Sequence, residues 1–585
     1  MNKWAHALRN IGTKVVLSLF GLIILYLTLL SVCSTCVEAG RIYEDGHIGN
    51  YVYFLPDNPF KHLAVFVGFV LLSFLIYSCH KKIHMPGNMF TYIMVICIAF
   101  CAVSVGFILF TRFKLVSDSD KVMKAAYEFM AGDFHQFEPG GYMFKNPHQS
   151  GFMLYMCGFI LVFGESAGLI MQIINAAAMA VAYYHIARIV YLFWEQKTAV
   201  IVTVLLMAVS MPMIFYTTFV YGIYIGFMFA VMAMYQELMF FRDEKIYRVF
   251  LTALFMSLSI ILKENFLIIL IAVFVLGIIE LFHKGKIKLL LQFAGIVLVG
   301  YLIGNQLVDS TMSAFLGFDL PKGLPATAYI TMGVEEGVVS PGSYNGRSGE
   351  IYEENDWDYD AANRAAKEEI AFVMGQYIHD WRSGLDFFGR KQASQWNEPS
   401  FQCFCILWGR GNGREIPEWI QSVIAGKISV FLLALFNLSQ TLVLVGVCLY
   451  LFLCRKEIGL EELLFAVIFI GGFLFHTFWE AKSQYTMLYF MILIPYMVKG
   501  YSRLLYHLTA LLTQFREKKG GTEKQLLTKR ALIAICVIII MIPAAIRISK
   551  TKTFRYIFMP ISDEALLIQY EEIIDNIKGG QAYFY

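Results

Sequence analysis

The sequence predicts an all-α polytopic membrane protein, and three observations carry this prediction. Hydrophobic residues make up 58% of the 585 residues, aromatic residues 16% and charged residues only 16%. A soluble domain has about 25% charged residues, so the composition excludes a soluble, a disordered or a disulfide-stapled secreted protein. Long apolar segments alternate with loops along the whole chain, and nearly all the charged residues lie in those loops.

Thirteen apolar segments approach or exceed the length needed to cross a bilayer, which is about 20 residues of helix. They contain six charged residues, each within four residues of a segment end, where a long side chain can reach the interface. These are Arg188, Glu237, Glu280, Asp309, Lys427 and Lys499. The segments are 15–33, 63–79, 89–110, 166–192, 198–220, 222–241, 249–262, 266–281, 289–312, 427–454, 463–478, 484–500 and 531–546.

The distribution of Lys and Arg predicts the orientation, because short basic loops stay in the cytoplasm. The N-terminus carries Lys3, Arg9 and Lys14, and its apolar run is longer than a signal-peptide core, so we expect an uncleaved first span. The other basic loops are 80–88, 242–248, 282–288 and 501–530. Thirteen crossings place all of them inside, as expected of a multi-pass cell-membrane protein with a cytoplasmic N-terminus.

Residues 249–281 form one long apolar run that is interrupted only by Lys263-Glu264-Asn265. Both flanking loops are basic, so both ends of the run should be cytoplasmic. We therefore expect two short helices that meet at this tripeptide on the outer side. A single tilted helix is the alternative, and it would invert the orientation of everything that follows.

The predicted organisation has six parts. Residues 1–110 hold the first helices, including a hairpin of spans, and 111–165 form the first large outer loop. Periodicity in 359–383 and turn residues before it predict a small α or α+β subdomain within 313–426. The remaining parts are the transmembrane core 166–312, the last transmembrane helices 427–546 and an outer tail 547–585.

The 111–165 loop concentrates polar side chains at the end of a span. Asp118 and Asp120 precede a helix-like stretch, 121–130, which Ser117 or Asp118 could simply cap. A polar stretch, 145–151, follows, and the apolar stretch 152–163 is too short to span and suits an interfacial helix.

The order of these motifs resembles the GT-C superfamily of polyprenyl-phosphate-sugar-dependent glycosyltransferases. Protein O-mannosyltransferases and aminoarabinose transferases, of the glycosyltransferase family 39 type, belong to it. Four places between about 111 and 500 carry the resemblance: Asp118 with Tyr127 and Gly132-Asp133; Lys145 to Gly151 with Gly164; Lys263-Glu264-Asn265; and Trp479 to Tyr485 with Pro495. The chain departs from the family pattern because the acidic loop follows the third span and because Gln484 replaces an expected Arg.

The resemblance implies a GT-C-like bundle of about 13 helices and an inverting sugar transfer to an acceptor outside the cytoplasm. Asp118, or else Asp120, would be the general base. Lys145, Lys263 and Lys482 would bind the donor phosphate, although lysines at span ends can merely anchor helices. The residues expected to contact substrate are His148, Glu264, Glu480 and Tyr485.

The expected partners are a polyprenyl-phosphate sugar, a glycan, lipid or protein acceptor, and the bilayer. No basic stripe suggests nucleic acid. No cofactor or metal is required by this chemistry, and a divalent cation is compatible with the sequence but not indicated by it. The alternative is a transporter or a flippase of lipid-linked glycans without chemistry, which needs ionisable or broken-helix features near mid-membrane.

Overall fold

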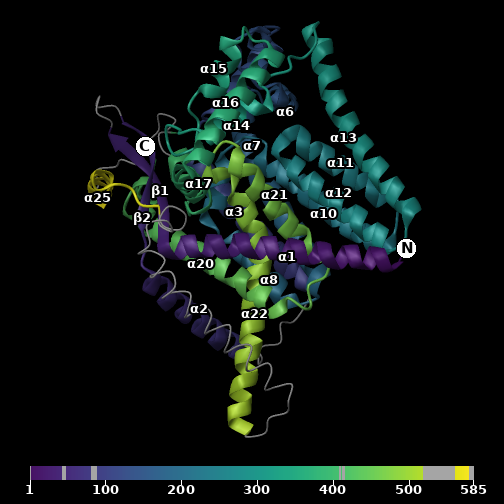
Figure 1. Cartoon of the computed structure of the whole chain (residues 1–585), viewed down its shortest axis with the longest axis vertical. Coiled ribbons are helices and arrows are strands. Elements are labelled where there is room, and N and C mark those ends of the chain that lie inside the picture. Colours follow the sequence, from purple (N-terminus) through teal and green to yellow (C-terminus); the bar gives the residue numbers. More distant parts are fainter. Residues whose placement is uncertain are drawn as a thin grey trace.

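A computed structural model describes residues 2–42, 48–80, 88–407, 410, 416–517 and 560–578. In this part of the chain helices form almost all the regular structure, and one two-stranded sheet accompanies them. Nine of these helices are long and apolar enough to cross a membrane, or ten when the bent pair α8–α9 counts as one span. The chain is therefore a predominantly α-helical polytopic membrane protein (Figure 1).

Each of the first twelve predicted segments lies on a helix or a bent helix pair. The thirteenth, 531–546, lies outside the described residues, so the count of thirteen is not confirmed. The helices are α1 (Asn2–Cys33), α2 (Pro59–His80), α3 (Met89–Thr111), α7 (Ala167–Trp194), α8 (Lys197–Ala208), α9 (Met211–Phe215), α10 (Ile223–Asp243), α11 (Tyr247–Leu262), α12 (Leu267–His283), α13 (Ile287–Leu316), α20 (Lys427–Cys454), α21 (Leu464–Phe478) and α22 (Met487–Glu517).

The long apolar run breaks into two helices where the sequence predicts. Helix α11 ends at Leu262, and Lys263 has an extended backbone with φ −157° and ψ 107°. A short turn, η5 (Glu264–Phe266), leads into α12, and α10 packs against both α11 and α12. The prediction of two short helices meeting at Lys263 is confirmed.

Short helices form most of the first large loop. Its elements are α4 (Asp118–Met130), η1 (His135–Phe137), α5 (Tyr142–Lys145), η2 (Pro147–Gln149) and α6 (Ser150–Phe163), and η3 (Gly164–Ser166) joins α6 to α7. Ser117 makes no side-chain cap hydrogen bond, and Asp118 is the first residue of α4 rather than its cap. The capping alternative therefore does not account for Asp118.

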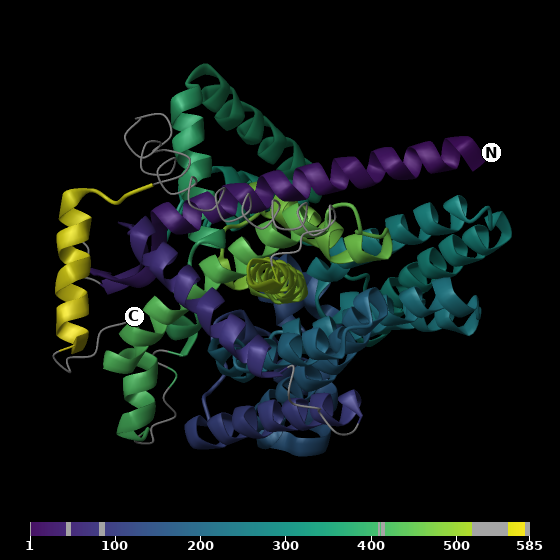
Figure 2. The same ribbon diagram turned by 90° about the horizontal axis from the view of Figure 1, so that it is seen from below.

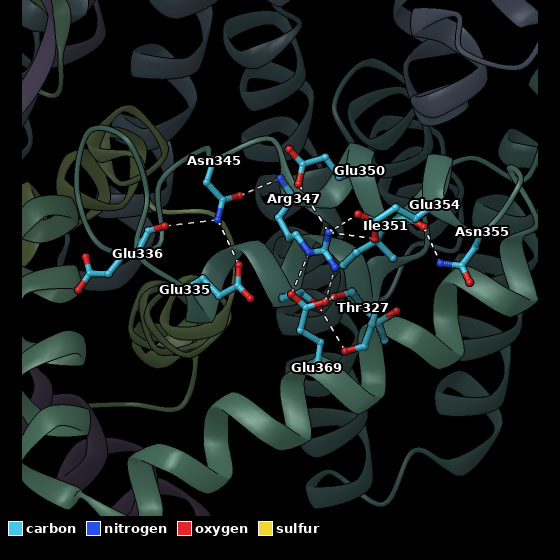
Figure 3. A network of polar contacts seen from close by, with 12 residues as sticks. Thr327, Glu335, Glu336, Asn345, Arg347, Glu350, Ile351, Glu354, Asn355 and Glu369 are labelled. Carbon is cyan, nitrogen blue, oxygen red and sulfur yellow. Dashed lines mark hydrogen bonds and ion pairs between the residues drawn. The ribbon is translucent and has the colours of Figure 1, made fainter. Parts of the chain in front are cut away.

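The second large loop holds six helices and no strand in its described residues. They are α14 (Ala326–Val334), α15 (Arg347–Glu354), α16 (Tyr359–His379), α17 (Trp381–Trp396), α18 (Cys403–Leu407) and α19 (Glu418–Ala425). Arg347 joins α15 to α16 because its Nε and Nη2 each donate to Glu369 at 2.9 Å, while Nη1 binds Glu354 (Figure 3). Helices α14, α15 and α16 lie together at the top of Figure 1.

A β-hairpin, which the sequence analysis missed, follows α1. Strands β1 (Ser34–Ile42) and β2 (Ile48–Pro56) pair antiparallel over nine residues each. Helix α25 (Glu564–Lys578) packs beside them (Figure 2). The rings of Tyr53 and Tyr570 are in contact, and the Ser562 amide donates to the Phe54 carbonyl. This part of the C-terminal tail therefore lies at the end of α1 that carries the hairpin.

Glu237 corrects one expectation about charges in the spans. It lies near the end of the predicted segment, but its side chain is fully buried on α10 instead of reaching an interface. Neither carboxyl oxygen has a hydrogen-bond partner among the described residues. Such a position requires a neutral carboxyl, because an isolated buried charge is very costly.

Candidate functional site

Four connections between helices converge at one end of the bundle, called here the Asp118 end. Asp118 begins α4, Tyr221 precedes α10, Lys263 separates α11 from η5, and Lys482 precedes η7 (Ser483–Tyr485). The sequence breaks its apolar runs at these positions, so polar side chains from distant segments meet where helices end. His148 of η2 joins the same group through electrostatic contact with Asp118 and Lys263.

Asp118 lies between a cation and a phenol. Its Oδ2 accepts a hydrogen bond from the Tyr221 hydroxyl at 3.3 Å, and its Oδ1 lies 3.6 Å from Nζ of Lys121. The carboxylate side chain is 33% exposed, so a ligand can reach it. Asp118 is thus an accessible carboxylate with a fixed orientation, which is what a general base requires.

Gln149 fixes the phenol that faces Asp118. Its Nε2 donates to the Tyr221 hydroxyl at 3.1 Å and to the Tyr142 hydroxyl at 2.9 Å. A tyrosine oxygen that accepts a hydrogen bond from Gln149 still carries its own O–H, which can donate to another group. The amide therefore favours the proton arrangement in which Tyr221 donates to Asp118.

Gly222 allows the Tyr221 and Lys263 segments to touch. It has φ +72°, and a Cβ added there would collide with the Leu262 carbonyl oxygen. Nζ of Lys263 consequently lies 3.6 Å from the centroid of the Tyr221 ring, in a cation–π contact. Burial lowers the pKa of Lys263 to about 8, against the opposing effect of Asp118.

A second charged group approaches from the connection between α21 and α22. Nζ of Lys482 lies 2.9 Å from Glu480, and the Tyr485 hydroxyl donates to Glu480 at 3.0 Å. Burial works against the charged form of Lys482, but Tyr485 and Glu480 outweigh it and raise the Lys482 pKa. Lys482 and Lys263 also interact with Asp118, so two cations and two carboxylates share this region.

Lys391 of α17 holds the backbone beside Glu480. Its fully buried ammonium donates to the carbonyls of Gly333 and Trp479, the latter at 2.8 Å. Burial lowers the pKa of Lys391 to about 7, with Glu480 opposing. The Ala481 amide donates to the Gly342 carbonyl at 2.7 Å. The second large loop therefore hydrogen-bonds to the residue before Glu480, Trp479, and to the residue after it, Ala481.

Glu398 holds the η7 turn through a hydrogen bond with Ser483. This fully buried carboxylate accepts from the Ser483 hydroxyl at 2.8 Å, from the Gln402 amide at 2.7 Å and from the amide and hydroxyl of Ser400. Burial raises its pKa although these bonds oppose the change. Glu398 therefore positions the residues that follow Lys482.

Arg410 clamps the segments that carry Asp118 and Tyr221. Its buried guanidinium donates to the Lys114 carbonyl at 2.8 Å and to the Thr218 carbonyl at 2.9 Å. Lys114 lies four residues before Asp118, and Thr218 lies three residues before Tyr221. The relative position of the base candidate and its phenol partner thus depends on one arginine.

The structure brings seven of the nine predicted residues together and leaves two apart. The residues that interact electrostatically in one group are Asp118, His148, Lys263, Glu264, Glu480, Lys482 and Tyr485. Glu264 is an exposed member of this group beside Lys263, and Asp120 is exposed on α4. Nζ of Lys145 turns toward the second large loop and lies 5.0 Å from the centroid of a Trp357 ring.

A small apolar cavity of about 50 Å³ is lined by Lys263 and Tyr485. It lies between α10, α12, α21 and α22, with Gln484 and His476 also on its wall. Along α10 it extends from Ile223 to Met234, which is about 16 Å at 1.5 Å per residue. The cavity therefore leads from the charged group into the apolar interior of the bundle.

Sequence reasoning missed Tyr221, Gln149, Lys391 and Glu398. Tyr221 had a usable signal, because it stands with Gly222 between two apolar segments on the predicted outer side. The Lys391–Trp479 and Glu398–Ser483 contacts join residues 88 and 85 positions apart, and no local pattern reports them. Among the described residues there is no group of three side chains that could hold a metal ion.

A scan against protein-family models found no match to this chain, and a search of the curated proteins found none either. The class that the fold defines is a polytopic helical membrane protein. Its candidate site is the charged group at the Asp118 end.

Proposed function

We propose that the chain is an integral-membrane glycosyltransferase that uses a polyprenyl-phosphate sugar as donor. The Asp118 end would face away from the cytoplasm, as the basic loops at the other end of the helices predict. The acceptor would be a glycan, lipid or protein outside the cytoplasm. Asp118 would be the general base, and Lys263 and Lys482 would bind the donor phosphate.

The observation that carries this proposal is the position of two lysines beside an apolar cavity. Lys263 lines the cavity, and Lys482 adjoins Tyr485, which also lines it. A polyprenyl phosphate has one charged head and one long apolar chain, so its phosphate would meet the lysines and the first part of its chain would lie toward the cavity. Asp118 interacts with both lysines and is 33% exposed, which puts it within reach of a sugar on that phosphate.

The proposed reaction uses three side chains of the protein, one as the base and two as cations for the phosphate. Asp118 accepts the proton of the acceptor hydroxyl, whose oxygen attacks the anomeric carbon from the side opposite the phosphate. The bond between that carbon and the phosphate oxygen breaks, and its electron pair leaves with polyprenyl phosphate. Lys263 and Lys482 stabilise the charge that develops on the departing oxygen. The anomeric configuration inverts.

Mass spectrometry of the lipid that co-purifies with the full chain tests the donor assignment. We expect polyprenyl phosphate, free or sugar-linked, in the wild type and at least tenfold less in Lys263→Met/Lys482→Met. Lys61→Met/Lys367→Met removes two lysines away from the cavity and should retain the lipid. Equal retention by all three proteins, or phospholipid alone, would contradict the proposal.

Transport of a lipid-linked glycan is the second candidate, and Glu237 is the observation that favours it. A buried carboxyl without a hydrogen-bond partner in a membrane helix is a frequent feature of proton-coupled transporters. In proteoliposomes, a flippase would move a labelled polyprenyl-phosphate sugar between leaflets without consuming it. Glu237→Gln would slow that movement, whereas the glycosyltransferase proposal expects transfer to continue in this variant.

A further inference from the structure

A polar cavity adjoins the Asp118 end. It has a volume of about 530 Å³ and lies between η2, the last turns of α13 and the connection that follows α13. His148 lines it, and the same ring interacts electrostatically with Asp118 and Lys263. His148 is exposed, so a ligand in the cavity can reach it. His148 thus connects this space to the proposed base.

One face of α13 supplies the polar wall. Gln306, Asp309, Ser310 and Ser313 line the cavity, and they follow the i, i+3, i+4, i+7 spacing that places side chains on one helix face. On the opposite face, Val297 is buried inside the bundle. Gly304 also packs closely there, because a Cβ built on it would lie only 3.0 Å from the Cβ of Ser257. The polar face is therefore turned away from the protein core.

The same face becomes apolar further along the helix. Val299, Leu302 and Ile303 are 51%, 54% and 61% exposed, and the helical period of 100° per residue puts them on the face of Gln306 and Ser310. The face of α13 that carries Gln306 and Ser310 is thus apolar up to Ile303 and polar from Gln306, while Leu307 and Phe315 are exposed on other faces. A ligand lying along it would meet lipid-like surface first and polar groups next.

The end of a membrane helix can be polar simply because it reaches water. Helix α13 has 30 residues, about 45 Å, and exceeds the hydrocarbon core by about 15 Å. An open helix end would not, however, create a recess with walls from three segments of the chain. The third wall is the connection that follows α13. The amide of Leu324 in this connection donates to the Lys145 carbonyl at 3.0 Å, which holds the connection close to η2.

The lining groups indicate what the cavity binds. Hydroxyls, an amide and the carboxylates Asp309 and Asp319 dominate, and Lys322 already lies 3.6 Å from Asp360. This set suits a neutral or amine-bearing sugar and repels a phosphate. The apolar surface below suits an attached lipid chain.

We infer that this cavity binds the acceptor, and that the acceptor is a lipid-linked glycan whose sugar end is not phosphorylated. The inference rests on the proposed transfer reaction. The glycan lies against Gln306, Ser310 and Ser313, the lipid follows the exposed face of α13, and His148 marks the passage by which a sugar hydroxyl reaches Asp118.

Photolabelling of the full chain in lipid nanodiscs tests the inference without requiring turnover. The probe is dodecyl β-glucoside with a diazirine on the sugar, and mass spectrometry identifies the labelled peptides. We expect labelling within 147–148 and 306–322 and a decrease of at least fivefold in Gln306→Leu/Ser310→Leu. Gln421→Leu/Ser439→Leu, which changes the same residue types at exposed sites elsewhere, should label like the wild type.

Competition experiments distinguish the possible ligands of the cavity. Unlabelled dodecyl glucoside should displace the probe at concentrations at least tenfold below those of dodecanol or free glucose. Equal competition by dodecanol would mean a plain apolar site, equal competition by glucose would mean a soluble acceptor, and labelling elsewhere would mean another site. Each result would overturn the inference. Asp118→Asn should label normally even if it abolishes transfer, so failure of this inference is distinguishable from failure of the proposed reaction.

Discussion

The Tyr221 hydroxyl donates a hydrogen bond to Oδ2 of Asp118 at 3.3 Å, and this contact joins residues 103 positions apart. Tyr221→Phe removes the donor and leaves the ring. A hydrogen bond to a charged group contributes about 1.5 kcal/mol or more, so we expect kcat to fall by about tenfold with little change in the donor KM. Steady-state kinetics with a polyprenyl-phosphate sugar measures both constants.

The matched control is Tyr344→Phe, which removes a hydroxyl from a tyrosine that is 59% exposed on the second large loop. It should behave as the wild type. If Tyr221→Phe retains full kcat, the phenol does not orient the base.

Lys263 gives the donor affinity a dependence on pH. Burial lowers the Lys263 pKa to about 8, so the ammonium is charged below this pH and neutral above it. The phosphate loses one of its two cations as pH rises, and we expect donor affinity to be constant below about pH 8 and to weaken by up to about tenfold per pH unit above it. Direct binding of polyprenyl phosphate measures the profile.

The Lys263→Arg variant supplies the control for this profile. An arginine stays charged throughout the range and can keep a cation–π contact with Tyr221. Its affinity should therefore be flat with pH. An unchanged alkaline decline in this variant would assign the titration to another group.

Gly222→Ala tests the close approach between α10 and α11. The added methyl group would collide with the Leu262 carbonyl at a residue with φ +72°, so the two segments must separate. We expect about 1–3 kcal/mol of destabilisation and a loss of transfer activity larger than the loss of folded protein. Gly158→Ala, at a position with open space, should leave both thermal stability and activity unchanged.

Glu398 and Ser483 should act as a coupled pair. Glu398→Gln replaces an acceptor oxygen by an amide donor among four donating groups, which costs about 1–3 kcal/mol. Ser483→Ala removes one of these donors. A double-mutant cycle in thermal stability should give a coupling energy of about 1 kcal/mol. Additive effects would show that the carboxylate does not hold η7.

Much of the fold follows from local sequence patterns. The break at Lys263, the helix that begins at Asp118 and the short α6 were predictable because apolar length and polar interruptions decide where membrane helices end. The β-hairpin was not predicted, because the apolar search does not register strands of nine residues. Residues 51–55, Tyr-Val-Tyr-Phe-Leu, are a short continuous apolar run, which is compatible with a buried strand and could have indicated β2.

The candidate site was predictable only in part. Lysines and carboxylates at span ends were visible in the sequence, and seven of the nine chosen residues do meet. Lys145 could not be separated from Lys263 by position alone, since its direction depends on Trp357, more than 200 residues away. The positioning roles of Lys391, Glu398 and Arg410 depend on tertiary contacts with residues distant in the sequence and could not be read from their neighbours.

The most direct test of the account compares Asp118→Asn with Asp120→Asn. Both carboxylates lie in the first turn of α4, but only Asp118 contacts Tyr221 and the lysines. The measured quantity is the rate at which the folded protein releases polyprenyl phosphate from a polyprenyl-phosphate sugar in the presence of acceptor. We predict a decrease of about 10²–10⁴-fold in Asp118→Asn and a wild-type rate in Asp120→Asn. A wild-type rate in a stably folded Asp118→Asn protein would contradict the assignment of Asp118 as the base.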